Sequence, residues 1–563
     1  MGSEEFTFNL KPIIDFTKKN WAWMLLVAIL IFGFYLRSYH IDYPVIGYHN
    51  WKEVHYLSEA RNFAEEGFFE HGFFVPYRDF WSLKEQGSDG VHGDTFPTIS
   101  ILAGAAFKLF GESLLIARLI GILFNTASIG LMYLIVKHLT RKKAFALIVA
   151  ALAAIMPIFT FYSHNVQLMN VGLPFSLLGV WLFLKWKDKE KKSFLIGSAA
   201  SFAIAGLTKY PFLAVGFGLL FIFPYKRLKI KNVRKVYPQY LIVLLILLSV
   251  PLWMVYSSSI ASEYNVITST SIELVKIGEI FTSNFWKITK SYTSDNFTIT
   301  GIIIAGIGLL LLFLKGFKGR DEFARFLFGY LIGFIVFFLV MSYKLSGHSY
   351  HYFPVAPLII ILMGYTIFVV SNTVYKLLKQ TDKKIQLAGK VVVIILLLIM
   401  IYNPATEARN RQYDTQFYGL DVAGEYLERH ATSGERIIHS SHQAYGVLWH
   451  GDVRGTRGIP NNINDWKYAV EDLGVRWAFV YNWDFNKVMG DPDIWNYVQD
   501  NFEFRQAGLT RQGERMAPVY LLFEKGAGFN ETSLNEQLNS GPRSTATYEL
   551  TTGKQQLVIV TNE

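Results

Sequence analysis

Residues 47–72 read "GYHNWKEVHYLSEARNFAEEGFFEHG" and follow a long apolar run that ends near residue 36. Histidine, glutamate and aromatic side chains are crowded together in this stretch, with one lysine and one arginine among them. The spacing predicts a helix that begins near Asn50, with Glu53, Tyr56 and Ala60 on one face. What these side chains do depends on the side of the membrane on which they lie, so the neighbouring apolar runs come next.

Apolar runs recur from near the N-terminus to about residue 400, and 52% of all residues are hydrophobic, as in a membrane protein. The runs lie near residues 21–36, 113–136, 144–162, 166–184, 193–208, 210–225, 237–257, 299–314, 326–343, 353–374 and 386–402. Most approach the roughly 17–25 residues that cross a bilayer. Their interiors are almost free of charge, with Arg118 near one end as the main exception. We therefore predict a polytopic helical membrane protein with about eleven spans.

Basic residues gather in alternate loops, and this asymmetry predicts the topology. The clusters occupy residues 137–143, 185–192, 226–235, 315–325 and 376–390. The loops around His164, around Lys209, and at residues 258–298 and 344–352 hold few basic residues. The positive-inside rule places the N-terminus and the clusters in the cytoplasm, with hairpin turns at His164 and Lys209 outside. The net charge of +10 is thus a topology signal, and we expect no nucleic-acid partner.

Two polar segments then lie outside the cytoplasm: the loop 38–112 and the C-terminal region 405–563. The C-terminal region alternates β-like runs ("RIIHSS", "RWAFVYN", "PVYLLFEK", "QQLVIVT") with helical ones ("DVAGEYLERHA", "DWKYAVEDLG", "PDIWNYVQDNF"). This alternation predicts a soluble α/β domain after a membrane domain of residues 1–404. Residues 526–547, rich in Gly, Asn, Ser and Thr, are expected to form a loop before a last strand. The chain has no cysteine, so no disulfide holds either segment together.

Four segments resemble the GT-C class of membrane glycosyltransferases. They read "WKEVHYLSEARNFAEEG" (51–67), "HGDTFPTISILAGAAFKLFGESLLIARL" (92–119), "AGLTKYPFL" (205–213) and "KLSGHSYHYFPVAPLIIILMG" (344–364). Their order is similar to that in protein O-mannosyltransferases, in the lipid A aminoarabinose transferases, and in a poorly characterised prokaryotic branch. The resemblance covers roughly residues 20–400. It implies a multi-pass plasma-membrane enzyme whose active site and C-terminal domain face the outside.

The resemblance also implies a reaction. A sugar would move from a polyprenyl-phosphate carrier to a lipid, glycan or protein acceptor, with inversion at the anomeric carbon. The acceptor hydroxyl must lose a proton as it attacks, which calls for a carboxylate within hydrogen-bond reach. On the family pattern the acidic pair falls on Lys52 and Glu53, which leaves Glu53 as the expected base. Asp94, close to a glutamate of the related branch, is the alternative.

The leaving phosphate needs cations and hydrogen-bond donors. Relatives often place a lysine before a Pro-Pro pair, and here that position is Phe96. The cation is therefore expected elsewhere. The residues that the resemblance implies in substrate binding are His49, Trp51, Lys52, His55, Tyr56, Arg61, Lys209, Tyr210, Lys344, His348, His351 and Tyr352.

Three alternatives remain open at this point. The histidines of the outer loops, together with Asp94 and Glu53, have the chemistry to hold a divalent metal, although no spacing among them is diagnostic. A transporter would be another class of membrane protein, but transporters tend to carry charged or broken helices near the midplane. A GT-C scaffold without catalysis is the third alternative, because the acidic pair is incomplete.

Overall fold

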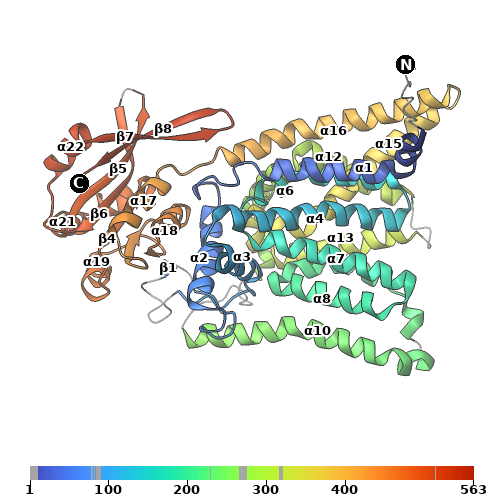
Figure 1. Ribbon diagram of the computed structural model, residues 1–563, viewed down its shortest axis with the longest axis horizontal. Coiled ribbons are helices and arrows are strands. Elements are labelled where there is room, and N and C mark those ends of the chain that lie inside the picture. Colours follow the sequence, from blue (N-terminus) through green and yellow to red (C-terminus); the bar gives the residue numbers. More distant parts are fainter. Residues whose placement is uncertain are drawn as a thin grey trace, which may run out of the picture.

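The computed structural model describes residues 11–77, 80–81, 83, 90–228, 230–264, 275–315, 321–513 and 515–562. Parts of the loop 38–112 and of the basic cluster 315–325 lie outside the described residues. A bundle of long helices forms one end of the molecule and a β-sheet with flanking helices forms the other (Figure 1). Helix α16 leads from the bundle to the sheet and continues without a break across residue 404.

The bundle is built from the predicted apolar runs. Its helices are α1 (Lys11–Arg37), α4 (Leu114–Thr140), α5 (Lys143–Ile155), α6 (Pro157–Tyr162), α7 (Leu168–Lys189), α8 (Lys192–Thr208), α9 (Phe217–Leu220), α10 (Ile230–Glu263), α11 (Ser283–Phe297), α12 (Ile299–Lys315), α13 (Glu322–Val340), α14 (Ser342–Gly347), α15 (Ala356–Leu377) and α16 (Lys383–Tyr413). Among the described residues, 7 helices are long and apolar enough to cross a membrane, or up to 8 if a pair bent by 93° counts as one span. The protein is thus a helical membrane protein, and the count of about eleven spans stays a prediction.

Both predicted hairpins have their turn where the sequence places it. Helix α8 ends at Thr208 and is followed by Lys209 and a 3₁₀ helix, η1 (Tyr210–Gly216), which begins with a proline at its second position. Helix α6 ends at Tyr162, so His164 lies in the connection to α7. Proline lacks the amide hydrogen and fixes its own backbone, which explains why the chain changes direction at Pro157 and Pro211.

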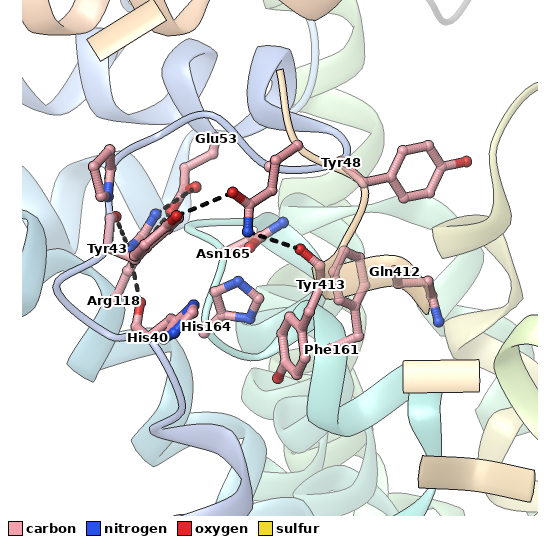
Figure 2. Close-up of a pocket in the computed structure, with 13 residues that line it drawn as sticks. His40, Tyr43, Tyr48, Glu53, Arg118, Phe161, His164, Asn165, Gln412 and Tyr413 are labelled. Atoms are coloured by element: carbon pink, nitrogen blue, oxygen red, sulfur yellow. Dashed lines mark hydrogen bonds and ion pairs between the residues drawn. The ribbon is translucent and has the colours of Figure 1, made fainter. Parts of the chain in front are cut away.

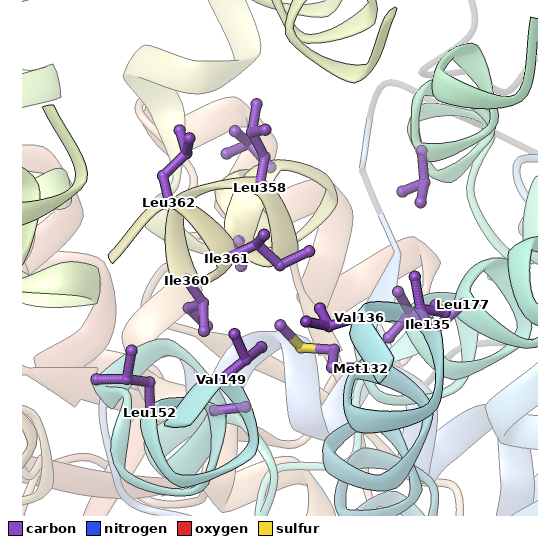
Figure 3. Close-up of a cluster of buried hydrophobic side chains, with 14 of the residues drawn as sticks. Met132, Ile135, Val136, Val149, Leu152, Leu177, Leu358, Ile360, Ile361 and Leu362 are labelled. Carbon is purple, nitrogen blue, oxygen red and sulfur yellow. The ribbon is translucent and has the colours of Figure 1, made fainter. Parts of the chain in front are cut away.

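The buried centre of the bundle lies between α4, α5, α7 and α15. Met132, Val149, Leu177 and Ile361 contribute to it from these helices (Figure 3). Helices in lipid gain little from the hydrophobic effect between them and associate through close packing of small residues. Gly364 provides such a contact, because a Cβ there would lie 2.6 Å from a methyl group of Val149.

Basic loops meet at one end of the bundle. His138 and Arg141 contact Asp188 at 3.2 and 3.4 Å, and Arg227 contacts Glu190 at 2.6 Å. Three of the predicted basic clusters are therefore neighbours in space, as one cytoplasmic face would require. Lys209 and Lys344 lie elsewhere, around a common cavity described below.

The C-terminal region forms most of an eight-stranded sheet in the order β1-β3-β2-β4-β6-β5-β8-β7. The strands are β1 (Phe80–Trp81), β2 (Arg436–His439), β3 (Arg454–Thr456), β4 (Trp477–Tyr481), β5 (Phe502–Gln512), β6 (Arg515–Lys525), β7 (Arg543–Leu550) and β8 (Gly553–Thr561). The first four in this order are parallel and the remaining pairs are antiparallel. Strand β1 comes from the outer loop, so the sheet joins both polar segments.

The predicted strands β2, β4, β6 and β8 are confirmed, as are helices α17 (Leu420–His430) and α21 (Pro492–Asn501). Around "DWKYAVEDLG" the chain is helical but changes from α19 (Ile463–Lys467) to a π-turn. The prediction of a loop at residues 526–547 is wrong. This segment holds helix α22 (Glu531–Ser540), started by a capping box at Asn530, and most of β7, whose exposed polar residues hide its strand pattern from the sequence.

The predicted polar helix is α2 (Asn50–Glu66), and with α3 (Thr98–Phe110) it lies between the bundle and the sheet (Figure 1). Twelve of its residues are buried, far more than an amphipathic helix on a membrane surface would bury. Val54, Leu57 and Ala60 share one apolar cluster with Leu420 and Leu448 of the C-terminal region. Helix α2 is therefore an internal element that is covered from both sides.

We expect single cysteines to report the two faces, because the natural chain has none. Ser283 and Ser540 are exposed near the predicted outer side, and Ser193 is exposed between the basic clusters. In intact cells an impermeant maleimide should label Ser283→Cys and Ser540→Cys and leave Ser193→Cys unlabelled until the membrane is permeabilised. Labelling of Ser193→Cys alone would invert the topology.

Candidate active site

A cavity of about 720 Å³ opens where α2, the turn after α8 and the segment 341–351 meet. Its volume lies in the range typical of small-molecule sites, roughly 300–1,000 Å³. One part of its wall is polar and aromatic: Trp51, Lys52, Tyr56, His92, Asp94, Lys209, Tyr210, Lys344, His348, Tyr350 and His351. The other part is apolar and comes from the bundle: Leu213, Ala214, Phe217, Met254, Val336, Phe337 and Val340. The cavity can therefore hold a ligand with a charged head and an apolar tail.

Three lysines surround the polar part of the cavity. Lys209 is partly buried, and its ammonium lies 5.0 Å from the ring centre of Tyr350. Lys52 lies 4.6 Å from the ring centre of Trp51. Burial lowers the pKa of Lys209 well below its ordinary value, nearby Lys52 and Lys344 lower it further, and Asp94 raises it. Such a set of partly desolvated cations is suited to an anion.

Asp94 is the carboxylate that faces this cavity, and the backbone around it is fixed. Its carbonyl oxygen accepts a hydrogen bond from the indole of Trp253 at 3.0 Å. The amide of Phe96 donates to the carbonyl of Leu207 at 3.0 Å, and the hydroxyls of Thr98 and Thr208 lie 2.7 Å apart. The first contact attaches the loop of Asp94 to α10, and the other two attach it to the end of α8, directly before Lys209. The loop and the lysine thus keep a constant separation.

Glu53, the expected base, lies elsewhere. Both of its carboxylate oxygens accept hydrogen bonds from Arg118 of α4, at 2.8 and 3.0 Å, and the amide of Val166 donates to Oε1 at 3.1 Å. Glu53 borders a different space, of about 30 Å³, shown in Figure 2. A space of that size holds a water or two and no sugar. The structure therefore assigns Glu53 to a buried ion pair.

Arg61 is likewise held outside the cavity. Its guanidinium donates to Glu112 at 2.8 and 2.9 Å and to Asp452 of the C-terminal region at 2.7 Å. It also lies over the indole of Trp449, 4.1 Å from the ring centre. Arg61 connects α2, the end of α3 and the sheet region, so its predicted contact with phosphate has no support in this geometry.

Three further predicted binding residues do not line the cavity. His49 is buried with its ring 5.4 Å from that of Tyr350, and burial lowers its pKa to about 3, so this imidazole is neutral. Tyr352 faces a separate apolar groove beside Trp286 and Phe338. His55 does not line the cavity, but it contacts Glu59 and the lining residue His92. The remaining predicted binding residues all line the cavity.

Sequence reasoning missed two partners. Arg118 was noted as a charge near the end of an apolar run, and a carboxylate partner could have been sought for it, because a buried arginine is seldom unpaired. Glu59 lies off the face of Glu53, so the spacing of the helix gives no sign that it belongs to the site. It is fully buried, and Ser100 donates to its Oε2 at 2.6 Å.

Comparison with known proteins agrees with this architecture. The family model of dolichyl-phosphate-mannose-protein mannosyltransferases matches residues 94–254, which include the Asp94 loop and Lys209. A search of curated protein sequences returns no match.

Solved structures of two membrane glycosyltransferases share the fold. The archaeal oligosaccharyltransferase AglB from Archaeoglobus fulgidus, in complex with an inhibitory peptide and a dolichol-phosphate, is 12% identical; the match has a TM-score of 0.59 and covers 89% of this chain and 74% of that one. ArnT from Cupriavidus metallidurans, bound to undecaprenyl phosphate, is 13% identical, with a TM-score of 0.52 and coverage of 89% and 98%. The chain thus has the GT-C fold of membrane glycosyltransferases.

The ion pair of Glu53 leads to a prediction about stability. Glu53→Gln leaves the guanidinium of Arg118 buried without its counter-charge, so the free energy of unfolding should fall by about 3–5 kcal/mol. Thermal unfolding in detergent measures the loss. Glu112→Gln is the matched control, since Glu112 also pairs with an arginine but is 40% exposed, and its loss should stay within about 1 kcal/mol. Wild-type stability of Glu53→Gln with abolished sugar transfer would restore Glu53 as the base.

Proposed function

We propose that the protein is an inverting glycosyltransferase that moves a monosaccharide from a polyprenyl-phosphate carrier to a lipid, glycan or protein hydroxyl at the outer face of the plasma membrane. The observation that carries this proposal is the meeting of Lys52, Lys209, Lys344 and Asp94 around one cavity whose far wall is apolar. A carrier lipid needs the cations and the apolar wall together, and the acceptor needs the carboxylate.

The donor's phosphate is placed between Lys209 and Lys344, with its lipid along the apolar wall formed by α9, α10 and α13. Lysine ammonium groups bind phosphate through charge-assisted hydrogen bonds. Tyr210 lines the same cavity, and its buried hydroxyl has no hydrogen-bond partner within the described residues, so a phosphate or sugar oxygen could accept from it. ArnT was solved with undecaprenyl phosphate and AglB with a dolichol-phosphate, which supports a carrier of this kind.

The transfer step follows from these positions. The acceptor oxygen forms a bond to the anomeric carbon while the bond from that carbon to the phosphate oxygen breaks. The hydroxyl proton moves to the Asp94 carboxylate. The departing phosphomonoester gains negative charge, which the lysines stabilise. Attack from the side opposite the phosphate inverts the anomeric centre.

Asp94 is preferred to Glu53 as the base for a geometric reason. Asp94 lines the large cavity together with the lysines, whereas Glu53 has both carboxylate oxygens bonded to Arg118 in a space too small for a sugar. A general base needs hydrogen-bond reach to the proton that it accepts. We therefore give Glu53, which falls on the acidic pair of the family pattern, a structural role in this chain.

The alternatives are a transporter and a scaffold that binds the carrier without catalysis. The charged residues of the cavity come from α2, the Asp94 loop, the turn at Lys209 and the short helix α14. None of these described residues comes from the middle of a long spanning helix, where transporters place theirs. A scaffold without catalysis would keep the lysines but would have no use for a fixed carboxylate beside them.

Asp94→Asn should abolish general-base help while leaving the donor site intact. We expect transfer of labelled sugar to membrane acceptors to fall by about 10²–10⁴-fold, with unchanged affinity for the carrier lipid. Asp188→Asn, at the basic end of the bundle, is the control and should transfer normally. Normal transfer by Asp94→Asn would remove Asp94 from the reaction. Absence of transfer by the wild type from any polyprenyl-phosphate sugar would refute the function itself.

Donor affinity should depend on pH through Lys209. The pKa of Lys209 is lowered in the free protein, and a bound phosphate raises it, so binding takes up a proton at any pH between the two values. Affinity for a polyprenyl-phosphate sugar should be constant below this window and fall as the pH rises through it. Arginine stays charged, so Lys209→Arg should flatten the profile. Titrations of donor binding across the pH range measure both proteins, and identical profiles would contradict the assignment.

A further inference from the structure

At the edge of the cavity, where His92 forms part of the wall, three ligand-type atoms form a small triangle. His55 Nε2 lies 2.9 Å from His92 Nδ1, and each nitrogen lies 2.7 Å from Glu59 Oε1. His55 and Glu59 are spaced by four residues on α2 and therefore lie on one face of the helix. His92 comes from the loop that carries Asp94. The triangle thus joins two separate segments of the outer loop.

Hydrogen bonds alone satisfy this triangle poorly. A neutral imidazole has one N–H and one lone pair, and an ionised carboxylate has only acceptors. If both nitrogens donate to Glu59, two N–H groups face each other at 2.9 Å. If one nitrogen donates to the other, one of the contacts to Glu59 brings two lone pairs together. A cation above the triangle accepts all three lone pairs at once.

The charge balance points the same way. Glu59 is 0% exposed, and within the described residues its ion-pair partners are the two histidines, with no lysine or arginine among them. A buried carboxylate without a firm counter-charge is costly, and a divalent cation supplies that charge.

The surrounding residues resemble the outer support of a metal site. Ser100 donates to Glu59 Oε2 at 2.6 Å, which leaves Oε1 for the triangle. The opposite nitrogen of His92, Nε2, lies 3.8 Å from Asp94 Oδ2. Metal-bound histidines typically present their second nitrogen to a carboxylate, and bound carboxylates are themselves hydrogen-bonded.

We propose that His55, Glu59 and His92 bind one divalent transition-metal ion, with zinc the expected species. Two imidazoles and one carboxylate are a zinc donor set, and imidazole disfavours magnesium and calcium. A zinc–imidazole bond is about 2.0–2.1 Å long. An ion at that distance from His55 Nε2, His92 Nδ1 and Glu59 Oε1 would lie above the plane of these three atoms. The ion would attach the loop of Asp94 to α2, so the three ligands act as positioning residues for the carboxylate in the cavity.

The test is the metal content of the full-length protein, purified in detergent through a tag without histidine. Mass spectrometry of the elements should find about one zinc ion per chain. Cobalt exchanged into the site should give visible absorption, and zinc returned to the stripped protein should raise its unfolding temperature. Glu59→Gln and the less buried His92→Gln should each weaken zinc binding at least tenfold.

His71→Gln is the matched control. His71 also pairs with a glutamate, Glu66, but the pair is half-exposed and belongs to no group of three ligand atoms among the described residues. It should leave zinc content unchanged. Stripped protein that neither takes up zinc nor changes in stability would overturn the proposal, as would equal zinc binding by His92→Gln. These readouts need neither donor nor acceptor, so they stand apart from the outcome of the transfer assays.

Discussion

The bidentate ion pair between Glu53 and Arg118 is the contact on which the half of the molecule around α2 depends. Arg118 belongs to α4 in the bundle and Glu53 to α2, and the same guanidinium also donates to the carbonyl of Tyr43 at 2.6 Å. The chain that leaves the first span is thereby fixed to the bundle before α2 begins. Two buried charges are costly to desolvate, and a pair this well hydrogen-bonded offsets much of that cost. Loss of either partner leaves the other charge exposed to the full penalty.

Fixing α2 in this way decides what its other faces can do. One face contacts the C-terminal region through Arg61, Asp452 and the shared apolar cluster. Another presents Trp51, Lys52 and Tyr56 to the cavity. On the same side of the helix, between these residues, His55 and Glu59 contact His92 of the loop that carries Asp94. The helix that the sequence shows as a crowded polar stretch is thus divided among three separate tasks.

Local patterns in the sequence predict the local elements well. Apolar runs locate the helices, the spacing of residues 50–66 locates α2, and alternation locates β2, β4, β6 and β8. The family segments identify Lys209, Lys344 and Asp94 as candidate site residues. All three line one cavity in the structure. Strand β7 is not predicted from the sequence, because most of its residues are exposed and polar and it lacks the alternation of a half-buried strand.

The role of Glu53 could not be predicted in the same way. Its partner Arg118 lies 65 positions away, and nothing in the spacing of either segment reveals that they meet. Glu59 and His92, 33 positions apart, are hidden for the same reason. Family position gives the residue that aligns with a catalytic acid, and only the packing shows which carboxylate reaches the cavity.

The most direct measurement is the structure of the protein with a non-hydrolysable polyprenyl-phosphate sugar, determined by electron cryo-microscopy. We expect the phosphate between Lys209 and Lys344, at the roughly 2.7–2.9 Å of charge-assisted hydrogen bonds. The anomeric carbon should be open toward Asp94, and the lipid should lie against α9 and α13. Phosphate bound at Arg118, with Glu53 released from its ion pair and turned toward the sugar, would contradict this placement.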